Sequence, residues 1–534
     1  MDDAHDLVER LVADLRPLET GAARAWWEAA VTGEARAYRR VEAFRNRIDD
    51  LYAAAGVFEA LSRAREMELD DPLLARRVEL FYLEALPRQV DTRLARRINR
   101  LAAEAERDFA TFRPTFRGKR ASANDLDRVL REEPDEGVRR EAWEALKSVG
   151  PIVADRLREL VILRNRAAGR VGFPDFYRMR LALQEQDADR LDRLLAELEA
   201  RSGPAYRHTK RTIDEALATR YRRPSGVLEP WHYADQFFQD VPDVFGADLD
   251  AVYAGVDPIT VAGRFFDGIG LPVDDVLARS SLHEAEGKDP HAFATDIDRE
   301  GDVRILLNLR HNERWMGTTL HELGHAVYDL GIDPALPWDI RRPAHTLATE
   351  AIAMLFGRLS RSPAWMRDLK VLDHASARLD GPVAAEARAA MQIVVRWILV
   401  MAHFERGLYA DPEQDLNDLW WDLVERFQEV PRPDRPPDAA DYAAKIHVVV
   451  APVYYHNYML GECLASQIDR RLREDVLDGA ASYAGRREVG AWLGQRVFRA
   501  GASLHYDDLA DAATGSPVGP EAFAAQFLES PPGA

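Results

Sequence analysis

The chain has almost no cysteine and no long apolar run, and these two absences exclude several classes of protein. Cys463 is the one cysteine in 534 residues, so no internal disulfide can form and a disulfide-stapled secreted fold is excluded. No segment approaches about 18 uncharged apolar residues, so no membrane-spanning helix is expected. The first residues contain neither a basic segment nor a continuous apolar stretch, so no signal peptide is expected. These observations predict a cytoplasmic protein.

Positive charge is also in short supply. Lysine and arginine number 71 against 90 aspartates and glutamates, which gives a net charge of −19. An acidic surface repels phosphate backbones, so we expect no nucleic-acid partner. The same charge favours solubility, and no membrane partner is expected. The sequence is compatible with either a monomer or a homodimer.

Strand-like segments are few, and the abundance of Ala, Leu, Arg and Glu favours helix. Residues 302–309 (DVRILLNL) form the best strand pattern. We therefore predict a mainly α fold with a small β edge, built as one domain over residues 1–528 and followed by a disordered tail at 529–534. An apolar stripe at helical spacing, expected to be core, opens the chain with Leu7, Leu11, Leu15, Trp26 and Trp27.

The segment 316–331 (MGTTLHELGHAVYDLG) contains the pattern HExxH. Positions i and i+4 share one face of a helix, so His321 and His325 can reach the same ion. Neutral imidazole suits zinc at about 2.0–2.1 Å. Glu322 can reach a water molecule at that ion and take its proton. The pattern predicts one Zn²⁺, with Glu322 as the general base.

A catalytic zinc needs a third protein ligand, and Glu350 is the candidate. It follows His325 by 25 residues, on what the pattern indicates is the next helix, so the zinc-site segment covers residues 285–365. A buried acid among apolar neighbours needs a partner, which favours this assignment. Two alternatives remain: Glu350 is solvated, or His345 is the ligand instead.

Together these residues resemble the angiotensin-converting-enzyme family of peptidyl dipeptidases, within the gluzincin metallopeptidases and the broader group that includes the thimet-type oligopeptidases. The similarity runs through DVRILLNLRHNERWMGTTLHELGHAVYDLG, TEAIAMLFGRL, FFDGIGLP, DPHAFATDI and RELVILRNRAAGRVGFPDFYRMR. The early segment ARAWWEAAVTGEA is similar to the family's lid helices, here within residues 1–110. The resemblance implies a large helical ellipsoid with a deep central channel around the zinc helix.

The resemblance also implies substrate contacts outside the zinc site. Backbone contacts fall on His291 and Ala292, and contacts to the substrate's terminal carboxylate fall on Gln239, Lys445 and Tyr454. His447 matches a histidine that touches the reacting carbonyl. One of the tyrosines in VYYHNYMLGE is expected to donate a hydrogen bond to the oxyanion. By count from His447, Tyr454 fits the carboxylate role, whereas Tyr458 fits the oxyanion role only after an insertion; Tyr455 is a further substrate contact.

Three departures from the family pattern affect these expectations. The interval between His325 and Glu350 matches the thimet-type enzymes and is one residue longer than in the converting enzymes. The acid that orients a zinc histidine in the family is Met354 here, so its replacement is expected from Asp329 or a backbone carbonyl. The family's chloride-binding arginine is His456 here, so chloride activation is not expected.

The sequence therefore predicts a zinc-dependent peptidase that hydrolyses short peptides and releases C-terminal dipeptides. A thimet-type oligoendopeptidase is the close alternative, given the ligand spacing. A non-catalytic helical receptor or scaffold is disfavoured because both histidines, both glutamates and an oxyanion donor are present. A metal hydrolase acting on a non-peptide amide is a third interpretation.

Overall fold

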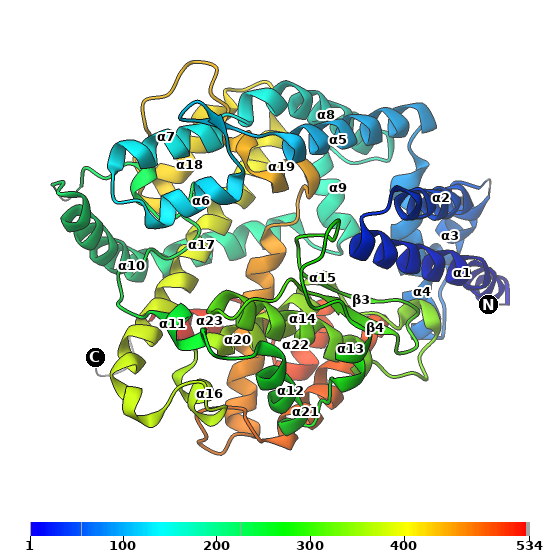
Figure 1. The fold of residues 1–534 in the computed structure, drawn as a ribbon. Helices are drawn as coiled ribbons and strands as arrows, with labels where there is room; N and C mark the ends of the chain where they lie inside the picture. Colours follow the sequence, from blue (N-terminus) through cyan, green and yellow to red (C-terminus); the bar gives the residue numbers. More distant parts are fainter. Residues whose placement is uncertain (1, 55, 225, 530–534) are drawn as a thin grey trace. The chain divides into compact units, whose positions relative to one another are not determined.

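The computed structural model describes residues 2–54, 56–224 and 226–529; apart from its first residue, the tail expected at 529–534 lies outside this part of the chain. Helices dominate, and the strands form two short antiparallel pairs, which confirms the mainly α prediction (Figure 1). Within the described ranges, no helix combines the length and the apolar character needed to cross a bilayer.

The chain folds into two compact units, each assembled from segments distant in sequence. Unit 1 contains Met1–Gln89, Asp248–Ala384 and Leu460–Ala522. Unit 2 contains Val90–Ala247, Ala385–Met459 and Phe523–Ala534. The single domain expected over residues 1–528 would include both units, and it stays a prediction.

Unit 1 begins with α1 (Asp2–Thr32), α2 (Ala35–Tyr52), α3 (Val57–Glu66), α4 (Pro72–Ala85) and η1 (Leu86–Gln89). Its middle segment contains α11 (Leu249–Tyr253), α12 (Pro258–Gly268), α13 (Asp274–Arg279), β3 (Phe293–Asp296), β4 (Val303–Leu306), α14 (Glu313–Gly331), η3 (Trp338–Ile340), α15 (Thr346–Gly357), η4 (Arg358–Arg361), α16 (Pro363–Asp368) and η5 (His374–Leu379). Its last segment contains most of α20 (His456–Asp475), then α21 (Arg487–Leu493), η7 (Gly494–Phe498), η8 (Gly501–Ser503) and α22 (Tyr506–Thr514).

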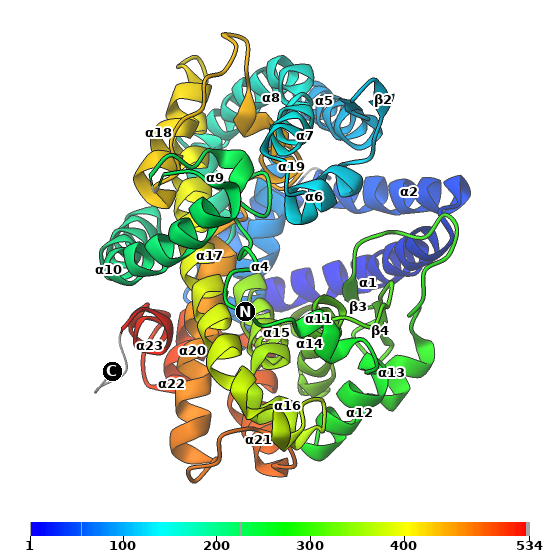
Figure 2. The same ribbon diagram turned by 60° about the vertical axis from the view of Figure 1, so that its left-hand side comes forward.

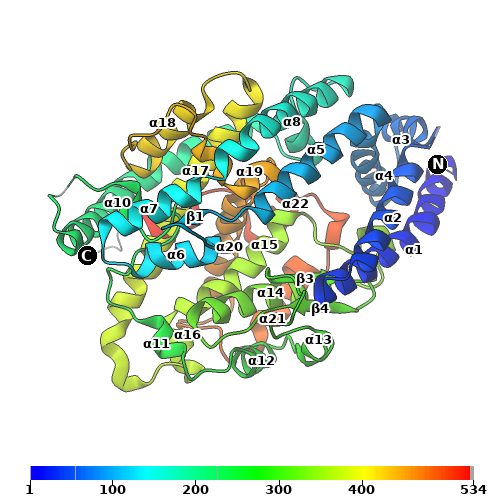
Figure 3. The same ribbon diagram turned by 45° about the horizontal axis from the view of Figure 1, so that its top comes forward.

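Unit 2 contains α5 (Thr92–Thr111), β1 (Thr115–Phe116), β2 (Lys119–Arg120), α6 (Ala123–Glu132), α7 (Glu136–Lys147), α8 (Gly150–Arg170), α9 (Phe176–Leu183), α10 (Ala188–Tyr221) and η2 (Pro230–His232). It continues with most of α17 (Asp380–Ala410), then α18 (Leu416–Gln428), η6 (Asp441–Ala444), α19 (Ile446–Val450) and η9 (Ala524–Leu528), and α23 (Glu521–Phe523) straddles the boundary. Helices α5 and α8 run side by side within this unit (Figure 3).

The N-terminal leucine stripe is core, as its spacing predicts. Leu7, Leu11 and Leu15 are buried where α1 packs on α2, α3 and α4, and α1 and α2 lie side by side in Figure 2. Trp26 and Trp27, at the other end of α1, are only half-buried. Each has its ring centroid 6.2 Å from that of Phe293 on β3, so α1 also contacts the strand that precedes the zinc helix.

Helices α14 and α15 pack together, and local chemistry starts each of them. The Asn312 side chain accepts a hydrogen bond from the backbone N–H of Trp315 and so caps α14. The His345 ring accepts a hydrogen bond from the backbone N–H of Leu347 and so caps α15. Gly324 lets the two helices approach closely, because a Cβ there would lie 2.8 Å from the Ala353 Cα atom. The connection between α14 and α15, residues 332–345, thus brings α15 back onto α14.

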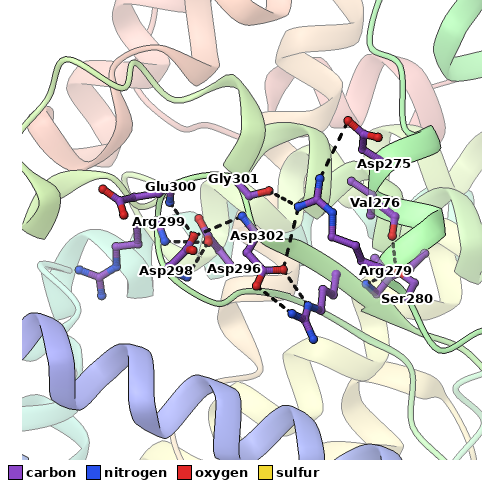
Figure 4. A network of polar contacts seen from close by, with 12 residues as sticks. Asp275, Val276, Arg279, Ser280, Asp296, Asp298, Arg299, Glu300, Gly301 and Asp302 are labelled. Atoms are coloured by element: carbon purple, nitrogen blue, oxygen red, sulfur yellow. Dashed lines mark hydrogen bonds and ion pairs between the residues drawn. The ribbon is translucent and has the colours of Figure 1, made fainter.

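The β3–β4 hairpin lies beside α14, and its turn is held by its own side chains (Figure 4). The Asp296 carboxylate accepts a hydrogen bond from the backbone N–H of Arg299 at 2.8 Å. The Asp298 carboxylate accepts hydrogen bonds from the backbone N–H groups of Glu300 at 2.9 Å and Asp302 at 3.2 Å. The expected strand at 302–309 shortens to β4.

The strand pattern at 302–309 also predicts a free edge that could bind an extended peptide, but the structure places that edge on another strand. β4 pairs with β3 on one side, and on the other the Leu307 amide donates to the Ser281 carbonyl at 2.8 Å. Because both sides of β4 are engaged, the outer strand available for an extended peptide is β3, which corrects the prediction.

Candidate functional site

The three predicted metal ligands converge in unit 1. His321 and His325 lie one helical turn apart on α14, and Glu350 reaches them from α15. Their ligand atoms all lie within 4.8 Å of one another. Glu350 Oε2 is 3.6 Å from His321 Nε2 and 3.9 Å from His325 Nε2. His345, the alternative ligand, instead caps α15, and its ring packs at a tilt against Tyr506 with a centroid distance of 5.1 Å.

The chemistry of this group suits a divalent zinc ion. Burial lowers the pKa of His321 to about 4, and burial together with His321 lowers the pKa of His325 to about 3. Both rings are therefore neutral near pH 7, which is the state in which imidazole binds a metal. Ligands bound tetrahedrally at about 2.0–2.1 Å lie about 3.3–3.4 Å apart, close to the separations found here. Two imidazoles and one carboxylate leave a fourth position open.

Glu322 lies at the same site but outside the ligand group. Its side chain is buried on α14, and its carboxylate accepts a hydrogen bond from the backbone N–H of Ala294 on β3. Burial, followed by the charge of Glu350, raises the pKa of Glu322 to about 8. A carboxyl group whose pKa lies near neutrality can both take and return a proton.

Thr349 is the outer partner of His325, and the sequence argument missed it. His325 Nδ1 lies 2.6 Å from Thr349 Oγ1, so the ring nitrogen facing away from Glu350 is hydrogen-bonded. Asp329, one of the two expected partners, interacts with Asp296 and Arg299, and burial holds its pKa well above its usual range. The available signal was a hydroxyl residue directly before the glutamate ligand, on the helix expected to face the histidines.

The predicted backbone contacts lie next to β3, the strand that packs on α14. His291 and Ala292 directly precede β3, the outer strand of the hairpin. The His291 side chain is 89% exposed and contacts Asp289 at 3.2 Å. Ala292 is half-buried. Their main-chain groups continue the line of β3, whereas the His291 imidazole points to solvent.

Unit 2 brings together the predicted carboxylate contacts. Lys445 Nζ donates to Gln239 Oε1 at 2.8 Å, although the two residues are far apart in sequence. The ammonium faces three aromatic rings, with centroid distances of 5.4 Å to Phe237, 5.1 Å to Trp397 and 5.5 Å to Tyr455. We call these five residues the lysine box. A lysine is more often a solvated surface residue, but Lys445 is buried.

Burial lowers the pKa of Lys445 to about 8, against the opposing attraction of Asp235 and Asp240. A buried ammonium of this kind gains from a carboxylate partner, because the pair offsets its desolvation. Phe237 and Trp397 were missed by the sequence argument, since an aromatic residue in an apolar helix or loop is more often plain core. An ammonium, an amide and a phenol are groups that suit a carboxylate partner.

Tyr455 is the tyrosine that belongs to this box. Its hydroxyl accepts a hydrogen bond from Nε1–H of Trp397 at 2.9 Å. Its ring centroid lies 5.0 Å from that of His447 and 5.3 Å from that of Tyr458. Tyr454 packs on Tyr458 at 5.2 Å. Counting from His447 favours Tyr454 for the carboxylate role, whereas this placement favours Tyr455. His447 and Tyr458, the two predicted oxyanion donors, flank the box.

His456, where the family has a chloride-binding arginine, is part of a buried hydrogen-bond network. Its Nε2 lies 2.6 Å from Gln186 Oε1, and Gln186 Nε2 donates to Asn457 Oδ1 at 2.7 Å. Asn457 Nδ2 in turn donates to Gln184 Oε1 at 2.7 Å. Neutral amides and one imidazole thus occupy this position.

Comparisons with known proteins agree with this geometry. The sequence model of the angiotensin-converting enzyme peptidases matches residues 252–523, just over half of the chain, a range that contains all three metal ligands. Carboxypeptidase 1 of Bacillus subtilis is 25% identical over 255 residues, which cover 42% of this chain and 49% of that protein. The angiotensin-converting enzyme of Theromyzon tessulatum is 22% identical over 420 residues, 70% of this chain and 65% of that protein. The chain thus spans less than two thirds of each relative's length.

Proposed function

The chain belongs to the angiotensin-converting enzyme family of peptidases, and from that premise we propose that it is a zinc-dependent peptidase acting on short peptides. The observation that carries the proposal is the convergence of His321, His325 and Glu350, with Glu322 buried beside them. A helix that presents two neutral imidazoles to a carboxylate on the next helix is the arrangement of a catalytic rather than a structural zinc, because it leaves a ligand position open.

When bound, the ion polarises the scissile carbonyl and lowers the pKa of a water molecule. Glu322 takes a proton from the attacking water and delivers it to the amine that leaves. Thr349 Oγ1 accepts a hydrogen bond from Nδ1–H of His325, so the Nε2 lone pair of that ring is left for the metal position that it shares with Glu350. The outer edge of β3 aligns the substrate backbone through main-chain hydrogen bonds.

Release of C-terminal dipeptides is the specificity that the lysine box supports. An ammonium with an amide and a tyrosine beside it is a suitable receptor for a free carboxylate. The family resemblance implies that His447 and Tyr458 donate hydrogen bonds to the carbonyl oxygen as it gains charge. Cleavage within oligopeptides is the second candidate, favoured by the thimet-like interval between His325 and Glu350.

The activity is tested by incubating the purified protein with a peptide library and identifying products by mass spectrometry, with and without a chelator. Hydrolysis that is lost with chelator and restored by zinc is expected. Products shortened by two C-terminal residues support the dipeptidase proposal, and internal fragments support the oligoendopeptidase. Stoichiometric zinc without any cleavage would favour a hydrolase of a different amide, and the absence of both would favour a scaffold.

The role of Lys445 is tested separately with Lys445→Met, which keeps the apolar stem and removes the charge. A charged hydrogen bond to a carboxylate contributes about 1.5–3 kcal/mol, so kcat/KM for peptides with a free C-terminus is expected to fall about 10- to 100-fold. C-terminally amidated peptides are expected to lose far less. The matched control is Lys210→Met, because Lys210 is also buried but pairs with Asp214. Equal losses for both kinds of peptide would refute the carboxylate role.

A further inference from the structure

The lysine box depends on an irregular loop, residues 235–240, that lies between η2 and α11 in unit 2. Two of its side chains enter the box: the Phe237 ring faces the Lys445 ammonium, and the Gln239 amide accepts from it at 2.8 Å. Such a loop has no helix or strand of its own to hold these groups. Their positions must be set by side-chain hydrogen bonds, made within the loop and by the elements around it.

Asp235 supplies three of those hydrogen bonds. Its carboxylate is buried, and it accepts the backbone N–H groups of Phe237 at 2.8 Å, Gln239 at 2.9 Å and Asp240 at 2.9 Å. One side chain thus closes the loop on itself and fixes the backbone of the residue that carries the amide. A buried carboxylate with three main-chain donors is a strong local constraint, because hydrogen bonds to charged groups exceed neutral ones.

Gln428, the last residue of α18, holds the other side of the same loop. Its Nε2 donates to the carbonyl of Phe237 at 3.0 Å and to that of Phe238 at 2.7 Å. Phe238 has a φ of +50°, a left-handed conformation that a non-glycine residue adopts only at a cost. The loop keeps this conformation because its donors and acceptors are both engaged.

We propose that Asp235 and Gln428 are positioning residues that preset the Gln239–Lys445 pair for a free peptide carboxylate. The inference rests on the proposed function and adds the part of the chain that prepares the receptor before substrate arrives. A receptor already held in its bound geometry loses less conformational freedom on binding and so binds more tightly. Neither residue needs to touch the substrate: both hold the loop that carries Gln239, and the charge of Asp235 also acts on Lys445.

The test uses the zinc-loaded full-length protein and pairs of peptides that differ only in a free or amidated C-terminus. Asp235→Asn loses at least one of the three hydrogen bonds, because an amide nitrogen cannot accept. Gln428→Met loses both donors without adding charge. In each variant the KM for the free acid is expected to rise about tenfold more than that for the amide, which corresponds to one charged hydrogen bond. Adding Asp235→Asn to Gln239→Ala is expected to change KM little further, since Asp235 positions the amide that Gln239→Ala removes.

The matched control is Asp91→Asn, which removes a carboxylate that accepts two backbone amides at the start of α5, remote in sequence from the box. Equal changes in KM for both peptides, in either positioning variant, would mean that the residue only supports the fold and would overturn the inference. If Asp235→Asn does not fold, Gln428→Met decides the matter alone.

If Lys445→Met itself fails to distinguish the two peptides, the receptor is wrong and the inference falls with it. If Lys445→Met does distinguish them but Asp235→Asn and Gln428→Met do not, the inference fails and the proposed function stands.

Discussion

Thr349→Val is expected to weaken zinc binding without removing any zinc ligand. Valine has nearly the shape of threonine but lacks the hydroxyl that lies 2.6 Å from His325 Nδ1. That hydrogen bond places the proton on Nδ1 and leaves the Nε2 lone pair free for the metal. Without it the ring can rotate and change tautomer, so part of the binding free energy is spent on ordering the ligand.

The expected size follows from the type of contact. Loss of one outer partner of a metal-bound histidine weakens metal affinity about 10- to 100-fold, or about 1.4–2.8 kcal/mol. The structure favours the upper part of this range, because the His325 side chain is only 16% exposed and the acid that orients a histidine elsewhere in the family is Met354 here. A short hydrogen bond in such a site has little competition from water.

The assay is a competition titration in which a fluorescent chelator of known affinity removes zinc from the protein. Thr349→Ser keeps the hydroxyl and is expected to bind zinc nearly as tightly as the unmodified protein. Thr346→Val is the control, because Thr346 is exposed on the first turn of the same helix. An affinity for Thr349→Val within twofold of the unmodified protein, or an equal loss in Thr346→Val, would refute the reasoning.

Three further predictions concern the same molecule. Glu322→Gln is expected to retain stoichiometric zinc by metal analysis while kcat falls by about 10² to 10⁴, because the amide cannot take a proton; full turnover would remove Glu322 from the mechanism. Gly324→Ala is expected to lower the free energy of unfolding by about 1–3 kcal/mol in urea titrations, because the new Cβ would lie 2.8 Å from the Ala353 backbone and push α15 away. The same displacement is expected to weaken zinc binding. Unchanged stability would contradict the close packing. Replacing chloride with acetate at constant ionic strength is expected to leave peptide hydrolysis unchanged, because His456 is already paired with Gln186, and chloride activation would show that an anion site exists nonetheless.

Much of the metal site could be predicted because its geometry is nearly local. His321 and His325 are four residues apart, and helical periodicity alone puts them on one face. Glu350 required one further step, that a short connection returns the next helix onto the first. The convergence of the three ligand atoms within 4.8 Å agrees with that step.

The lysine box could be predicted only through a family resemblance. Gln239 and Lys445 are separated by 206 residues, and no periodicity links two residues that far apart. The choice between Tyr454 and Tyr455 shows the same limit: counting along the chain favours one, whereas the packing of side chains puts the other beside Lys445. Asp235 and Gln428 carried no recognisable pattern, because their partners are backbone groups of a loop.

By itself the sequence determined the helical character, the acidic charge and the three residues that could hold a metal, since composition and short-range spacing act within one or two turns of helix. The tertiary structure alone decided that Thr349 supports His325, that β3 rather than β4 is the outer strand, and that a buried aspartate holds the loop carrying Gln239. These features depend on which surfaces meet after the helices pack. Contacts between distant segments are selected by the packing of the whole unit, and no short stretch of chain encodes them.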